Sequence, residues 1–146
     1  DPTVLVAFGR RVLLTHGDAL CLGDTGYQAF RKTARSVQWQ SDFLARPLPE
    51  RRRIAAGIRD ESRRLKRNQS PSGWVDVDAR AAAHWMREAA TPDLVHGHTH
   101  MPSTEAIGAG LVRHVLSDWD FEGPSPRGDV LRLDAQGFAR RSIASC

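Results

Sequence analysis

The sequence is poor in cysteine and contains no long hydrophobic run. Its 146 residues include only two cysteines, Cys21 and Cys146, which lie far apart. Two such distant thiols exclude a disulfide framework and favour a reducing compartment, the cytoplasm. No apolar run approaches the roughly 18 to 20 residues that cross a bilayer, and no signal peptide is recognisable. We therefore expect a single domain that is neither secreted nor embedded in a membrane.

Acidic residues are scarce in one part of the chain, although the net charge of the whole chain is only +4. Residues 31–67 contain twelve Lys and Arg against four Asp and Glu, whereas the remainder contains nine against thirteen. The basic character is thus confined to one patch. Such a patch attracts the phosphates of a nucleotide, a nucleic acid or an anionic membrane, but a solvated arginine-rich helix has the same composition.

Hydrophobic periodicity predicts a mixed α/β fold without internal repeats. Apolar and β-branched runs predict strands at 4–6, 11–15, 94–95, 111–116, 130–133 and 138–143. Apolar residues at helical spacing predict helices at 25–34, 50–67 and 76–89. The helix at 50–67 has a narrow apolar stripe among many arginines, which is typical of a lid, and the polar segment 68–73 after it is predicted to be a hinge. Because a strand pattern follows Asp1-Pro2 at once, we expect the chain to begin partway through a fold.

The most informative stretch is His96-Gly97-His98-Thr99-His100, which follows a short apolar run. If the strand continued, its three imidazoles would share one side, whereas a bend at Gly97 would turn His98 and His100 towards a common point. Imidazole is a strong ligand for zinc, manganese and iron, so the stretch predicts a metal site. An exposed turn rich in histidine is the alternative interpretation.

A second segment, His16-Gly17-Asp18, has the same local pattern of an apolar strand followed by His and Gly. Metal and phosphate sites in α/β folds lie where loops converge at the carboxyl ends of strands. We therefore expect His16, His98 and His100 to form one site. His84 and His114 lack this setting and are interpreted as a helix-surface residue and a strand residue.

These two motifs resemble the last two motifs of the calcineurin-like metallophosphoesterases. Within that superfamily, further residues resemble the UDP-2,3-diacylglucosamine diphosphatase family, the cytoplasmic pyrophosphatases of lipid A biosynthesis. Those residues are Leu20-Cys21, Asp24, 26–31, 53–55, Ser62 and 96–102. The resemblance implies the C-terminal half of an αββα sandwich, one partial domain over 1–146 with a helical lid inserted at 24–73. Three upstream family motifs, Asp-x-His, Gly-Asp and Gly-Asn-His/Arg-Asp, do not occur in this sequence, so we expect the 146 residues alone to be inactive.

The resemblance also implies a catalytic site with two manganese ions. By the family pattern, His16 and His98 bind one ion, His100 completes the shell of the other, and His98, the catalytic residue, also lies against the substrate phosphate. Two ions about 3.5–4 Å apart assist attack by water on the phosphorus next to uridine, which yields UMP and 2,3-diacylglucosamine 1-phosphate (lipid X). Zinc and iron suit the same ligands.

Two residues of the lid, Asp24 and Ser62, match family positions that contact the substrate. The match to the family is weaker further along the same helix, where this chain has Lys66 and then Gln69, and Lys66 is the third candidate for a substrate contact. From the residues alone, Asp24 is equally well explained as a helix N-cap and Ser62 as a helix-surface hydroxyl. The basic lid would lie against anionic headgroups on the cytoplasmic face of the bacterial inner membrane and make the protein a peripheral one.

Two other functions fit parts of the sequence. One is another binuclear phosphoesterase that hydrolyses dinucleoside polyphosphates or phosphodiesters, although such soluble substrates need no basic lid with an apolar stripe. The other is a non-enzymatic basic module that binds nucleic acid through residues 31–67. Few aromatic residues interleave these arginines and the histidine motifs would have no role, so no nucleic-acid partner is expected.

Overall fold

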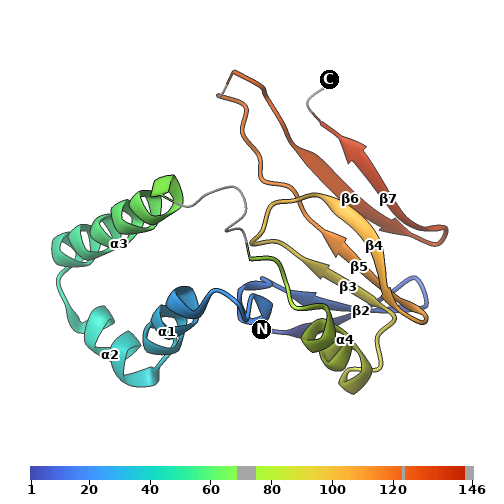
Figure 1. Ribbon diagram of the computed structural model, residues 1–146, viewed down its shortest axis with the longest axis horizontal. Helices are drawn as coiled ribbons and strands as arrows, with labels where there is room; N and C mark the ends of the chain where they lie inside the picture. The colour runs from blue at the N-terminus through green and yellow to red at the C-terminus, as the bar shows by residue number, and fades with distance from the viewer. Residues whose placement is uncertain (69–74, 123, 144–146) are drawn as a thin grey trace. The chain divides into compact units, whose positions relative to one another are not determined.

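The structure is a computed structural model that describes residues 1–68, 75–122 and 124–143, the side chains of 66–68 excepted (Figure 1). The chain divides into two compact units, one formed by 1–21 together with 77–146 and the other by 22–76. Both helices and strands are present, so the predicted mixed α/β class is confirmed. Among the described residues, no helix has the length and apolarity that crossing a bilayer requires.

A five-stranded mixed sheet is the centre of the first unit (Figure 1). Its strands are β1 (Thr3–Ala7), β2 (Arg10–Thr15), β3 (Asp93–His96), β4 (Ser103–Gly108) and β5 (Leu111–Val115). They lie in the order β1-β2-β3-β5-β4. The central β2, β3 and β5 are parallel, whereas β1 and β4 pair antiparallel at the two edges. The carboxyl ends of the three central strands therefore meet at one edge of the sheet.

Helix α4 (Ala79–Glu88) packs on one face of this sheet, where it contacts β3 and β4. Arg11 donates hydrogen bonds to the carbonyl oxygens of Ala89 and Ala90 just after the helix, at 2.9 and 3.1 Å. Leu13 lies two residues further along β2, so it points to the same face and is buried there. The helix in turn buries Ala82, Ala83 and Met86. Apolar burial on this face holds the central strands and their carboxyl ends in place.

The opposite face carries a buried polar group centred on His114. Its ring nitrogens lie 3.1 Å from the Thr104 hydroxyl and 3.4 Å from a carboxylate oxygen of Asp93. The ring also packs against Phe138 of β7 (Gly137–Ser142) with centroids 4.2 Å apart. β7 pairs antiparallel with β6 (Asp129–Asp134) in a second, two-stranded sheet. His114 is thus a structural strand residue, as predicted.

In the second unit the structure describes three helices, α1 (Thr25–Ala34), α2 (Val37–Ala45) and α3 (Leu48–Asn68). Asp24 and Ser36 cap α1 and α2 through hydrogen bonds from backbone N–H groups three residues on. None of its described residues is buried, and several large apolar side chains are exposed. These are Leu22, Phe30, Val37, Leu44, Leu48, Ile58 and Leu65. The predicted hinge at 68–73 lies, apart from Asn68, outside the described residues.

Candidate functional site

The two histidine motifs leave the sheet side by side. β2 and β3 are parallel neighbours, with Thr15 paired to His96, so the residues after each strand emerge at the same edge. The backbone N–H of Gly97 donates to the carbonyl of His16 at 3.2 Å and fixes this approach. The predicted convergence of the motifs at strand ends therefore follows from the register of two adjacent parallel strands.

The rings of His16 and His98 face each other with centroids 5.0 Å apart and planes at 64°. His16 Nδ1 lies 3.2 Å from Oδ1 of Asp18, a carboxylate that is fully buried, while the His16 side chain is half exposed. A carboxylate at one ring nitrogen orients an imidazole and leaves its other nitrogen to bind a ligand. The two imidazoles thus lie beside each other where β2 and β3 end.

His98 and His100 both have left-handed backbone conformations, with φ of 64° and 53°. This region costs a residue with a Cβ about 1–2 kcal/mol relative to ordinary backbone conformations. The strand ends at His96, so the alternative in which it continued and aligned the three rings is wrong. The chain turns sharply after Gly97 instead. Residues with strained backbone conformations occur often at binding and catalytic sites, where the conformation sets the direction of a functional side chain.

His96 has a structural position beneath this edge. Its ring is fully buried, and a Cβ added at Gly17 would lie only 2.8 Å from its Nδ1. Gly17 itself has φ of +99° and leads into a single 3-10 turn over Asp18–Leu20. A glycine is therefore required at position 17, both by its backbone conformation and by the closeness of the buried ring.

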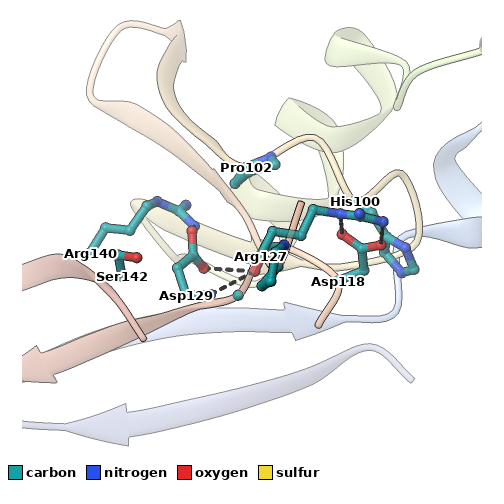
Figure 2. Close-up of a pocket in the computed structure, with 10 residues that line it drawn as sticks. His100, Pro102, Asp118, Arg127, Asp129, Arg140 and Ser142 are labelled. Carbon is teal, nitrogen blue, oxygen red and sulfur yellow. Dashed lines mark hydrogen bonds and ion pairs between the residues drawn. The ribbon is translucent and has the colours of Figure 1, made fainter. Parts of the chain in front are cut away.

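His100 is exposed and lines a pocket together with Asp118. Hydrogen bonds from the Arg127 guanidinium hold the pKa of Asp118 below its ordinary value, and the nearby His100 acts in the same direction. Arg127 donates to Asp118 at 2.6 and 3.0 Å and to Asp120 at 3.1 Å. Figure 2 shows His100 beside the Arg127–Asp118 ion pair.

The imidazole pair fits a divalent transition metal, because neutral histidine nitrogens with a carboxylate behind one of them are typical donors for manganese, zinc and iron. Within the described ranges, no three His, Cys, Asp or Glu side chains gather closely enough to hold an ion. The structure brings His16 to His98 and places His100 in the pocket with Asp118. The set of three histidines around two ions therefore stays a prediction.

The predicted substrate residues belong to the helical unit. Asp24 accepts a hydrogen bond from the backbone N–H of Tyr27 at 2.9 Å, so it is the N-cap of α1. Ser62 is exposed on α3. The side chain of Lys66 lies outside the described residues. The N-cap occupies one oxygen of Asp24, and the substrate roles of all three residues remain predictions.

Three polar residues near the histidines were not singled out from the sequence. Asp18 stands within the His-Gly-Asp motif, and its spacing from His16 was a signal that could have been used. Asp118 and Arg127 are nine residues apart in a segment rich in proline and glycine, without periodicity. Their pairing depends on the antiparallel bridge between Asp120 and Arg127, which no local pattern predicts.

Comparison with known proteins shows similarity over nearly the whole chain. It is 41% identical over 138 residues to the UDP-2,3-diacylglucosamine hydrolase of Chromobacterium violaceum, covering 94% of this chain and 56% of that protein. The enzyme of the same name from Ralstonia nicotianae is 43% identical over 141 residues, covering 91% and 52%. That from Xanthomonas oryzae pv. oryzae is 38% identical over 154 residues, covering 99% and 60%.

No protein-family model matches the chain. The chain spans about half the length of the curated relatives it matches. The similarity is nevertheless continuous through both units, from the His16 motif across the helices to the second histidine motif and beyond, since it covers nine tenths or more of the chain. By sequence, the chain is similar over nine tenths or more of its length to UDP-2,3-diacylglucosamine hydrolases and corresponds to about half of such a protein.

Proposed function

We propose that the complete protein hydrolyses the pyrophosphate bond of UDP-2,3-diacylglucosamine to UMP and 2,3-diacylglucosamine 1-phosphate, and that this chain supplies part of a site for two manganese ions. The proposal is supported by the name shared by the relatives and by one geometric observation. The rings of His16 and His98, from motifs 80 residues apart in sequence, lie 5.0 Å apart at the ends of adjacent parallel strands.

In this proposal His16 and His98 hold one ion and His100 belongs to the shell of the other. Bound divalent ions lower the pKa of water and neutralise charge that develops on a phosphate during in-line displacement. Asp18 orients the His16 ring, and the left-handed backbone fixes the directions of His98 and His100. His98 also contacts the phosphate that is attacked. We expect the remaining ligands in the rest of the complete protein.

The helical unit is proposed to be a lid in an αββα sandwich. Asp24, Ser62 and Lys66 would contact the substrate, and the exposed apolar side chains would receive its acyl chains. Acidic residues of this unit pair with Arg46, Arg63 and Arg64. Among the described residues, the exposed Arg52, Arg53 and Arg59 have no acidic partner.

These arginines would bind the anionic cytoplasmic face of the bacterial inner membrane. Each basic residue close to such a surface contributes about 1 kcal/mol of attraction. With a local excess of eight positive charges over residues 31–67, the attraction is large enough to hold a peripheral protein at the membrane. The proposed substrate has two acyl chains that partition into the membrane, so a protein held at the membrane surface would be close to it.

The test replaces His98 by asparagine in the complete protein. Asparagine tolerates the left-handed conformation at this position, so the variant removes the imidazole with little added backbone strain. We expect UMP release to fall at least about a hundredfold, as for loss of a group that acts directly on the transition state. His84→Asn, on the exposed surface of α4, is the matched control and should keep wild-type turnover. Near-normal hydrolysis by the His98 variant would refute the assignment.

A further inference from the structure

The pocket that contains His100 has a volume of about 350 Å³, within the range of roughly 300–1,000 Å³ that small-molecule sites occupy. It lies wholly within the first unit, between the turn after β3, the segment from β5 to β6, and β7. Figure 2 shows His100 and Asp118 at one end and Arg140 with Ser142 towards the other. A small molecule held here would therefore have one end beside a proposed metal ligand.

Two ion pairs decide which chemistry this pocket accepts. Arg127 pairs with Asp118 at 2.6 Å, and Arg140 pairs with Asp129 at 2.8 Å. Arg140 also donates to two backbone carbonyl oxygens of neighbouring strands, at 2.7 and 3.0 Å. The positive charges are therefore already compensated. A phosphate is disfavoured as a ligand because it would face two carboxylates. An acyl chain is disfavoured because it would remove water from four charged side chains.

A neutral polar ring suits this lining. Each guanidinium carries five N–H donors, and Arg127 commits three of them to described carboxylates, while its side chain remains half exposed. Asp118 offers acceptor lone pairs directly beside these donors. Uracil has an edge on which a ring N–H lies next to a carbonyl oxygen. The carboxylate can accept from this ring N–H while the neighbouring guanidinium N–H donates to the carbonyl oxygen. Pro102 and Pro126 add apolar surface on which a flat ring can pack.

We propose that this pocket binds the uridine part of the substrate, with Asp118 accepting the uracil N3–H and Arg127 donating to an adjacent carbonyl. The inference rests on the proposed function, since the scissile phosphorus next to uridine would then lie at the metal site that includes His100. Cytosine has a lone pair at N3 and an amino group beside it. It would place that lone pair against the carboxylate, so the pocket should select uridine over cytidine nucleotides.

The experiment uses Trp119 as a reporter, because its indole N–H donates to the backbone oxygen of Asp129 at 2.9 Å on the pocket lining. The indole signal of ¹⁵N-labelled chain, assigned with Trp119→Phe, is followed by NMR while uridine, UMP, CMP or inorganic phosphate is added. Uridine and UMP should shift it saturably, and CMP should bind about tenfold more weakly, as expected for a lost hydrogen bond to a charged group. Inorganic phosphate should leave the signal in place.

Arg127→Gln should weaken UMP binding about tenfold. Its matched control is Arg132→Gln, which removes an equally exposed arginine that pairs with Asp134 outside the pocket and should bind UMP normally. In the complete protein, the Arg127 variant should raise KM with little change in kcat. Unchanged UMP binding in that variant, or an equal shift with inorganic phosphate, would overturn the inference.

The two proposals fail in different ways. Normal hydrolysis by the complete protein without any effect of uridine on Trp119 would overturn the pocket assignment and leave the proposed function in place. If Trp119 reports saturable, uracil-selective binding but the complete protein does not hydrolyse the substrate, the pocket is supported as a uridine site and the proposed function is refuted.

Discussion

Replacing His98 by glycine and by alanine separates the contribution of the backbone from that of the imidazole. Both changes remove the ring and its contact with His16, so the difference between them reports the conformation of residue 98 alone. At φ of 64°, alanine keeps the strain of a Cβ in the left-handed region, about 1–2 kcal/mol, whereas glycine has none. Relative to alanine, glycine lowers the free energy of unfolding by about 0.4–1 kcal/mol, because it has more conformational freedom in the unfolded chain.

The free energy of unfolding should therefore be about 1 kcal/mol higher for His98→Gly than for His98→Ala. The matched pair at His84, in the interior of α4, should show the opposite sign, because alanine is favoured over glycine there by about 1 kcal/mol. Urea denaturation of all four variants measures both differences, and each corresponds to a change of roughly 3 °C in Tm.

The reversal of sign between the two positions is what the strained backbone requires. Equal stabilities of the two His98 variants, or a more stable alanine variant, would show that residue 98 relaxes to an ordinary conformation. The proposal that the backbone at His98 is strained in order to direct its ring would then be wrong.

Three further predictions concern packing, pH and the membrane. Gly17→Ala should cost at least about 2 kcal/mol in urea denaturation, because its Cβ meets a buried histidine ring at 2.8 Å, whereas Gly57→Ala, in open space on α3, should stabilise by about 1 kcal/mol. Burial lowers the pKa of His114, so as the pH decreases below about 6.5 the unfolded chain takes up the proton first and the free energy of unfolding should decrease. His114→Gln should make the free energy of unfolding depend less on pH in this range, and an unchanged dependence would contradict the prediction. Charge reversal at 51–53 should reduce sedimentation with anionic vesicles but not with neutral ones, and unaltered binding would remove the membrane role.

Local patterns predicted much of the secondary structure. The helix expected at 25–34 is α1, and the helix expected at 76–89 contains α4, because an N-cap and a run of amphipathic turns act within a few residues of each other. The strands β2, β3 and β5 follow from apolar runs that can be buried on both faces of a sheet. Among the α-helices and β-strands of the described residues, two were not predicted, α2 and β4.

The reason differs for these two elements. α2 begins at the Ser36 N-cap and stacks Trp39 on Phe43 at 4.9 Å, but its apolar residues lack the regular spacing of a buried face. β4 is a largely exposed edge strand that contains Thr104 and Glu105, with no alternation of apolar residues. It forms because it pairs with β5, and this pairing is a property of the folded sheet and not of the segment itself.

For the site, the sequence by itself determined which residue types were available: two histidine motifs, each placed after an apolar strand and each containing a glycine. Their meeting depended on the parallel pairing of β2 with β3, which brings His16 and His98 together across 82 positions. The Asp118–Arg127 pair and its pocket likewise exist only in the folded chain. Side-chain chemistry is fixed residue by residue, whereas distance between remote residues is fixed by strand register and by burial of the sheet faces, which are decided by the whole fold.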